Sequence, residues 1–260
     1  MMQLYIHSKD ASMGWIIGFH SASNILSKSP EKVKELHLKT GRTNDRSREM
    51  EALAEKHGIV IDRSSRQQME KKFGKSHQGI AIRCIDPEIF DDRFLISLVK
   101  KVGKEGFFLM LDGITDPRNL GACMRSAECA GVDAVIIPRN KSVGITPSVV
   151  KVASGAAELV PLVMVTNISR TISLMQELGI WVFGASLDTQ KSIYECDFRG
   201  PSLVVLGSEA MGMKKSTRDK CDYVGRIPMV GQLNSLNVSV AAGILLFEAL
   251  RQRVENRVVR

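Results

Sequence analysis

The sequence predicts an α/β protein of two domains, of which the second is built on a mainly parallel sheet. From residue 107 onward, short apolar runs typical of strands alternate with segments of helical spacing. Such repeated β-α alternation favours a parallel sheet with helices on both faces. The chain has 260 residues, 44% of them hydrophobic, which is enough for one or two domains with buried cores. We therefore expect a first domain at residues 1–83, a linker at 84–105 and a second domain at 106–260.

The first domain reads as a small α/β unit. An apolar run at 15–19 precedes a possible helix start at 20–26. After it we expect strands at 33–38, 59–61 and 80–83, and helices at 45–57 and 65–73. Gly58 follows the first of these two helices, at the place where glycine commonly ends a helix. The linker holds one expected helix, 93–101, and is otherwise a connector.

In the second domain the expected elements follow one another with short connections. Strands are expected at 107–111, 134–138, 159–163, 180–185, 202–206 and 223–227, and helices at 148–155 and 168–178. Asp116 is expected to cap a further helix, with Pro117 in its first turn, where the missing N–H of proline is harmless.

The C-terminal stretch from Ile227 to Leu250 combines a glycine loop, a polar cluster and a long apolar helix. Ser235 or Asn237 can cap this helix, because each side chain offers an oxygen to the unpaired N–H groups of the first turn. The helix is apolar on more than one side, so it is expected to be covered by two layers. Polar side chains beside exposed backbone donors suit a binding site, and simple capping is the alternative explanation.

The charge of the chain favours a polyanionic partner. The net charge is +8, and residues 1–83 hold 15 Lys or Arg against 9 Asp or Glu, so this third carries +6 of the excess. A solvated basic surface without a partner is the alternative.

Several classes of function are disfavoured. The five cysteines have neither zinc-finger nor redox spacing, which is typical of a reduced, cytoplasmic protein. No apolar run approaches the ~20 residues of a membrane helix, and the N-terminal run is too short for a signal peptide. All five histidines lie in the first third, so the second domain holds neither a histidine triad nor a histidine-ligated metal. Neither GxGxxG nor a P-loop occurs.

Three segments together carry a resemblance to a known family. The segments LDGITDPRNLGACMRSAECAG (Leu111 to Gly131), VVLGSEAMGM (Val204 to Met213) and the stretch from Ile227 to Leu250 resemble the three motifs of the SpoU, or TrmH-like, RNA ribose 2′-O-methyltransferases, in the family's order. The resemblance implies the SPOUT fold, in which the C-terminal segment passes through a loop as a deep trefoil knot. S-adenosylmethionine (SAM) is implied as the methyl donor, bound in the knotted loops, with no metal.

The resemblance also implies site residues. The catalytic set is Asn119, Arg125, Glu209, Ser235 and Asn237. The cofactor-binding set is Ala185, Gly207, Ile227, Met229, Ser235 and Leu236. Each residue also has an ordinary structural explanation; Arg125, for example, could pair with Glu128 on a helix surface. The family assigns Arg125 as general base, but a guanidinium keeps its proton in proteins, so electrostatic stabilisation is the simpler role.

Residues 1–83 resemble, more weakly, the L30e-like RNA-binding domain that precedes the catalytic domain in one branch of the family. The RNA contacts that we expect there are Arg42, Arg46, Lys75, His77 and Gln78. Basic side chains displace counterions from RNA.

The function implied is SAM-dependent methylation of a ribose 2′-hydroxyl, with guanosine in 23S ribosomal RNA as the expected target. Transfer RNA is an alternative substrate, and a non-catalytic RNA-binding or ribosome-assembly protein is an alternative class. The family also implies a homodimer built through the second domain.

Overall fold

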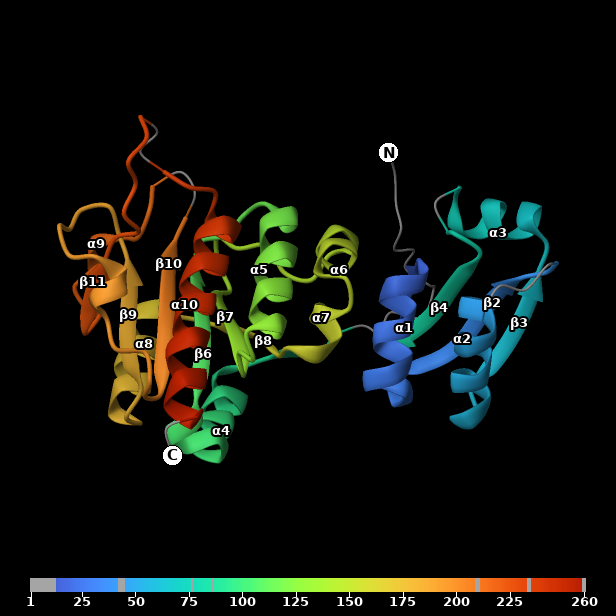
Figure 1. Ribbon diagram of the computed structural model, residues 1–260, viewed down its shortest axis with the longest axis horizontal. Helices are drawn as coiled ribbons and strands as arrows, with labels where there is room; N and C mark the ends of the chain where they lie inside the picture. The colour runs from blue at the N-terminus through green and yellow to red at the C-terminus, as the bar shows by residue number, and fades with distance from the viewer. Residues whose placement is uncertain are drawn as a thin grey trace. The chain divides into compact units, whose positions relative to one another are not determined.

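The computed structural model describes residues 13–41, 45–75, 77–85, 87–208, 211–232 and 235–258. The chain divides into two compact units (Figure 1). Unit 1 comprises residues 1–88 together with 145–159, and unit 2 comprises residues 89–144 and 160–260. Each unit has its own sheet.

Unit 1 is built on a four-stranded sheet of order β1-β4-β2-β3. The strands are β1 (Met13–Ile17), β2 (Val33–Lys39), β3 (Val60–Ser64) and β4 (Ile80–Ile85). β4 runs antiparallel to β1 and β2, whereas β2 and β3 are parallel. The three strands expected from the sequence are present, and the fourth, β1, includes the first three residues of the apolar run at 15–19.

The described helices of unit 1 include the three expected in the first domain, in the expected order, and three others. They are α1 (Phe19–Lys28), η1 (Pro30–Lys32), α2 (Asp45–Lys56), α3 (Arg66–Phe73), α6 (Pro147–Ala153) and α7 (Ala156–Leu159). Ser65 caps α3 in a capping box with Gln68, which satisfies two backbone donors of the first turn. α7 was not expected. Its last residue, Leu159, is the first residue of the segment predicted as a strand at 159–163, and the strand itself begins later, at Leu162.

Unit 2 is built on a seven-stranded sheet of order β11-β9-β10-β6-β7-β8-β5, in which all neighbouring strands are parallel. The strands are β5 (Ile89–Phe90), β6 (Phe107–Asp112), β7 (Ala134–Pro138), β8 (Leu162–Val165), β9 (Trp181–Ala185), β10 (Ser202–Gly207) and β11 (Tyr223–Gly225). The predicted mainly parallel sheet is confirmed. β5 was expected to be part of a connector; pairing with β8 makes this two-residue segment the edge of the sheet.

Helices cover both faces of this sheet. They are α4 (Asp92–Val102), η2 (Gly103–Glu105), α5 (Pro117–Cys129), α8 (Ile168–Glu177), η3 (Ile193–Glu195), α9 (Lys215–Arg218) and α10 (Val238–Val258). Buried residues of α4 and α8, such as Val99 and Ile172, share one cluster with sheet residues such as Phe108. α5 and α10 lie side by side (Figure 1). As predicted, Asp116 caps α5, and its Oδ1 accepts a hydrogen bond from the Arg118 N–H at 2.8 Å.

The threading of the C-terminal segment as a knot is not tested by the strand order and stays a prediction. Among the described residues, no helix is both long enough and apolar enough to cross a bilayer.

One arginine fastens the end of α10 to the strand starts at the amino edge of the unit 2 sheet. Arg253 donates five hydrogen bonds, and its Cζ lies 4.4 Å from the centroid of the Phe107 ring. The acceptors are the carbonyl oxygens of Phe198, Glu105, Gly106 and Gly200 and the hydroxyl of Ser202. A single guanidinium therefore satisfies polar groups of two separate segments, 105–106 and 198–202.

We expect Arg253→Ala to lower the free energy of unfolding by about 3 kcal/mol, because several partly buried carbonyl groups lose their donor together. Urea unfolding followed by circular dichroism measures this. Arg251→Ala is the matched control on the same helix. Its own side chain is 55% exposed, and Glu248, the less exposed of its two partners, keeps a hydrogen bond from Gln252, so loss of Arg251 should change stability much less. An equal loss of stability in the two variants would contradict the fastening role assigned to Arg253.

Candidate active site

A pocket of about 390 Å³ opens in unit 2, at the carboxyl ends of β9 and β10. We call it the loop pocket. Ligands of open α/β sheets commonly bind at this edge, where the loops leave the strands. The described lining residues come from four parts of the chain: 185–188 after β9, 206–208 and 211–213 at the end of β10 and beyond, 226–229 after β11, and 235–241 at the start of α10.

The six residues predicted to bind the cofactor all line the loop pocket. They are Ala185, Gly207, Ile227, Met229, Ser235 and Leu236. Their contact with a cofactor stays a prediction, but the structure brings them together from segments up to 51 residues apart. Gly207 has no space for a side chain, because a Cβ there would lie 2.0 Å from the backbone of Gly212 and Met213.

Asn237 joins the start of α10 to the first turn of α5. Its Oδ1 accepts hydrogen bonds from the N–H of Ser239 at 2.9 Å and from its hydroxyl at 2.6 Å, so Asn237 caps α10. Its Nδ2 donates to the Asn119 Oδ1 at 3.1 Å. Two predicted catalytic residues, 118 positions apart, are therefore in direct contact. Capping and a functional role do not exclude each other here, because the amide uses its oxygen for the cap and its nitrogen for Asn119.

The remaining predicted catalytic residues lie in different environments. Ser235 is exposed and lines the loop pocket. Arg125 is exposed on α5, six residues beyond Asn119 on the same helix. Glu209 lies outside the described residues. The first and third family-like segments thus meet in space, and the second supplies Gly207 to the pocket.

The loop pocket has lining residues that the sequence did not single out. The two charged side chains among its described lining residues are Asp188 and Arg226. Asp188 accepts a hydrogen bond from the Arg218 guanidinium at 2.5 Å, which connects the segment after β9 to α9. In the sequence, the only sign that Asp188 belongs to the site is its place shortly after a strand. Many other loop residues share that place, so it does not single out Asp188.

The predicted RNA contacts of unit 1 divide into exposed and buried side chains. Arg46, Lys75 and Gln78 are exposed, whereas Arg42 lies outside the described residues. His77 is only 4% exposed, and its Nδ1 accepts a hydrogen bond from the Gly79 N–H at 2.8 Å. Burial lowers the pKa of this imidazole, which favours the neutral ring that the turn requires. The His77 side chain thus supports the turn, and its exposed neighbour is Gln78; contact of either residue with RNA stays a prediction.

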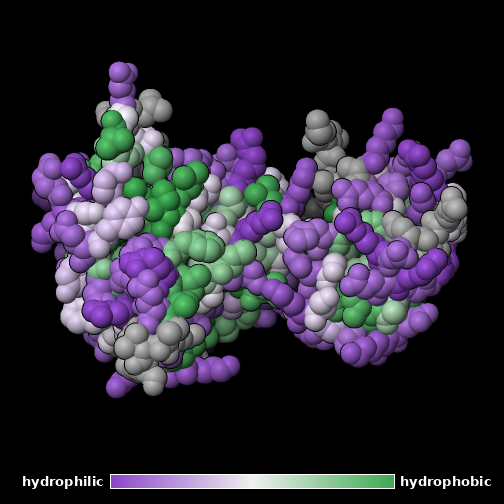
Figure 2. Space-filling view, viewed as in Figure 1, coloured by the Kyte–Doolittle hydropathy of each residue, from purple (hydrophilic) through white to green (hydrophobic). Residues whose placement is uncertain are grey.

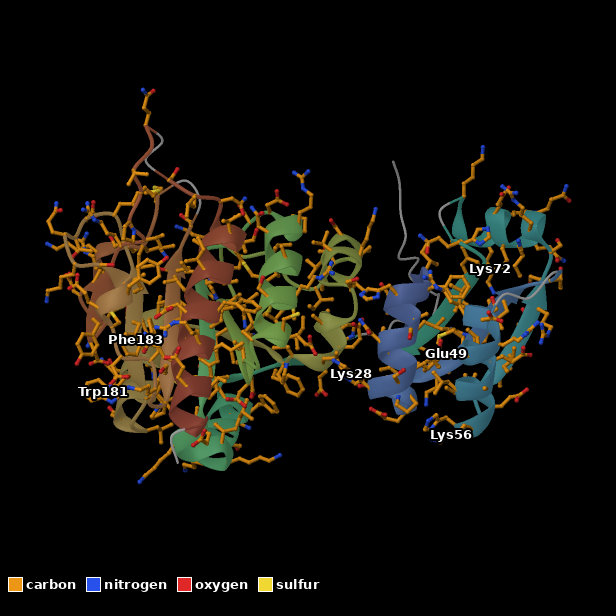
Figure 3. The ribbon with its side chains drawn as sticks, viewed as in Figure 1. Lys28, Glu49, Lys56, Lys72, Trp181 and Phe183 are labelled. Atoms are coloured by element: carbon orange, nitrogen blue, oxygen red, sulfur yellow. The ribbon has the colours of Figure 1, made fainter. Side chains whose placement is uncertain are left out.

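Arg46 also lines a second, more polar hollow of about 270 Å³ within unit 1. The other lining residues are Phe19, His20, Ser23, Glu49 and Met50, from α1 and α2. Glu49 projects from α2 (Figure 3). The hollow is lined by one cationic side chain, Arg46, and one anionic side chain, Glu49. Its charge therefore attracts neither anionic nor cationic ligands strongly.

One cluster in the described part of the chain has the residue types of a metal site, and it belongs to unit 1, whereas the loop pocket belongs to unit 2. It consists of Glu35, His37 and Asp62. The Lys72 Nζ lies 3.4 Å from the His37 Nε2 and 4.5 Å from the centroid of the Trp15 ring, so a protein cation already faces the cluster (Figure 3). Nothing in this arrangement connects a metal to the loop pocket.

Comparison with known proteins adds family information to this geometry. Residues 106–247 match the family model of the SpoU rRNA Methylase family. Residues 15–90 match a model described as RNA 2'-O ribose methyltransferase substrate binding. The chain is 42% identical over 242 residues to the 23S rRNA (guanosine-2'-O-)-methyltransferase RlmB of Pseudomonas syringae, which covers 93% of this chain and 97% of the relative.

Solved structures show the same fold. AviRb from Streptomyces viridochromogenes, a SpoU methyltransferase in complex with the cofactor AdoMet, superposes with a TM-score of 0.75, 22% identity and 95% coverage of each chain. A TrmH/SpoU tRNA modifying enzyme of A. aeolicus superposes with a TM-score of 0.55 and 26% identity. That superposition covers 64% of this chain and 85% of the A. aeolicus chain.

Proposed function

Because the chain belongs to the SpoU rRNA methylase family, we propose that it is a SAM-dependent methyltransferase that modifies the ribose 2′-hydroxyl of a guanosine in 23S ribosomal RNA. The observation that carries the proposal is the contact between Asn119 and Asn237 beside the loop pocket. The 42% identity to a 23S rRNA (guanosine-2'-O-)-methyltransferase supports it. The substrate implies a cytoplasmic site of action.

The loop pocket fits SAM in size and chemistry. Its volume of about 390 Å³ lies in the range of small-molecule sites. Apolar side chains such as Leu206 and Ile227 suit the adenine ring, and polar ones such as Ser186 and Asp188 suit the hydroxyl and amino groups. When bound, SAM would supply a sulfonium-activated methyl group for the ribose oxygen, leaving S-adenosylhomocysteine, and the hydroxyl proton would pass to water or to a neighbouring group.

The chain's own residues then position the ribose hydroxyl and stabilise the negative charge that develops on its oxygen. The hydrogen bonds of Asn237 to Ser239 and Asn119 hold both amides in one arrangement, and we assign them the orientation of the ribose hydroxyl. Arg125, exposed on the same helix as Asn119, keeps its positive charge. We assign it binding of a flanking phosphate and stabilisation of the negative charge that develops on the attacking oxygen.

Ribosomal RNA is favoured over transfer RNA by the extent of the match. The RlmB relative matches across both units, whereas the A. aeolicus tRNA enzyme covers 64% of the chain. The substrate-binding model matches residues 15–90, which hold exposed basic side chains such as Arg46 and Lys75. We propose that unit 1 recognises the RNA.

Mapping of 2′-O-methylation by primer extension, in a strain that lacks the gene, tests the proposal. We expect one stop on 23S RNA to disappear and to return when the gene is restored. Loss of a tRNA modification instead would favour the alternative substrate. Absence of SAM binding in calorimetry would favour a non-catalytic RNA-binding protein.

We also propose that the protein works as a homodimer through α10. Val240, Phe247 and Val254 are spaced seven residues apart, so they lie on one side of the helix, and each is about half exposed. Other apolar residues of α10, such as Ala242 and Leu245, are fully buried. Figure 2 shows hydrophobic residues gathered on the face that α5 and α10 present (compare Figure 1). An apolar stripe of this kind suits a self-complementary interface.

Sedimentation equilibrium at micromolar concentration should give twice the chain mass. If Arg125 serves the partner's pocket, then mixing Arg125→Ala chains with Asn237→Asp chains should restore one of two sites, because one pocket regains both groups. Asp at 237 keeps a capping oxygen but loses the amide donor. A fully active monomer would exclude the dimer, and an inactive mixture would place Arg125 in its own chain's site.

A further inference from the structure

Asp112 is a buried carboxylate that the reaction scheme does not use. It is the last residue of β6 and is 2% exposed. Its Oδ1 accepts a hydrogen bond from the Lys214 Nζ at 2.7 Å, and its Oδ2 accepts one from the Thr217 hydroxyl at 2.7 Å. Burying a carboxylate is unfavourable unless it is paired in this way, and removing its partners is correspondingly disruptive.

The partners of Asp112 belong to the segment that forms one wall of the loop pocket. Met211, Gly212 and Met213 line the pocket, and Lys214 follows them directly. Thr217 is 2% exposed in α9, so its contact is enclosed. Within the sheet, Asp112 pairs with Gly207, the glycine that lines the same pocket. One carboxylate thus links the end of β6 with the chain that returns after β10.

Gly207 shows how close this wall lies to the strand. The backbone of Gly212 and Met213 occupies the place where a Cβ of Gly207 would be. A small outward movement of residues 211–217 would therefore separate the wall from β10 and widen the pocket. The two hydrogen bonds to Asp112 oppose that movement.

We propose that Asp112 is a positioning residue, which holds residues 211–217 against β6 and β10 and thereby sets the affinity of the loop pocket for SAM. The identity of the ligand rests on the proposed function, whereas the holding of the wall does not. Because Asp112 is buried behind the wall, it acts on the ligand through the wall and does not touch the RNA.

The expected result is a selective loss of cofactor affinity. Asp112→Asn keeps the shape but removes the charge that both donors face, and we expect SAM to bind about tenfold more weakly. At saturating SAM, kcat and the KM for RNA should stay within about twofold, because the groups that orient the ribose are unchanged. Global destabilisation alone would lower the active fraction and leave the KM for SAM unaltered.

Adjacent lysines provide a matched control. Lys214→Ala removes one hydrogen bond to Asp112, whereas Lys215→Ala removes an exposed lysine with no contact to it among the described residues. Lys214→Ala should weaken SAM binding severalfold, Lys214→Arg should restore much of it, and Lys215→Ala should match the wild type. If Asp112→Asn does not fold, Lys214→Ala and Thr217→Val decide the question.

Calorimetry with SAM and hydrogen exchange of the peptide that covers 211–217 are the two measurements. Faster exchange in Asp112→Asn together with weaker SAM binding supports the proposal. Unchanged exchange, or wild-type SAM affinity in the folded variants, overturns it. A wild-type protein that binds no SAM overturns the proposed function instead, and exchange of the peptide still tests whether Asp112 holds the wall.

Discussion

Replacement of Arg125 by alanine is expected to lower kcat by at least about a thousandfold while SAM affinity stays within a few-fold. Arg125 is exposed on α5 and is absent from the lining of the loop pocket, so its proposed partner is the RNA. Loss of its charge would remove both the proposed phosphate contact and the proposed stabilisation of the attacking oxygen. Single-turnover methylation with labelled SAM gives the rate, and calorimetry gives the cofactor affinity.

Arg170→Ala is the control for this experiment. Arg170 is also an exposed arginine of unit 2, but it lies on α8. If Arg125 acts only through the general attraction of positive charge for RNA, the two substitutions should have similar, salt-dependent effects. Near-normal turnover of Arg125→Ala would remove this residue from the mechanism.

Gly207→Ala is expected to disrupt the loop pocket. A Cβ at this position would lie 2.0 Å from backbone atoms of Gly212 and Met213, and backbone cannot rotate away as a side chain can. The wall must therefore move or the strand must shift, and overpacking of this kind costs roughly 1–3 kcal/mol or more. We expect a lower melting temperature and at least about tenfold weaker SAM binding.

The matched control is Gly200→Ala, near the start of the same strand. Its Cβ would meet only the Trp181 side chain, at 3.9 Å, which is an ordinary contact. Thermal unfolding and calorimetry should therefore leave this variant close to the wild type. If Gly207→Ala binds SAM normally, the close approach of the two backbones does not shape the pocket.

Much of the fold could be predicted because the signals are local. The Asp116 cap and Pro117 placed the start of α5 within one residue, and apolar runs placed β6, β7 and β10. The errors fell where tertiary pairing decides. β5 has only two residues and is a strand because β8 lies beside it. His77 reads as a polar turn residue, but packing buries it.

By itself, the sequence determined most of the order of strands and helices, narrowed the cap of α10 to Ser235 or Asn237, and indicated the family that the three motifs resemble. Each strand, helix, cap and motif is recognised from residue spacing within a short segment, where hydrophobic period and capping act directly. The tertiary structure alone decided which distant groups meet: Asn119 with Asn237, and Asp112 with Lys214 and Thr217. Contacts across more than a hundred residues depend on strand order and register, which no local pattern encodes.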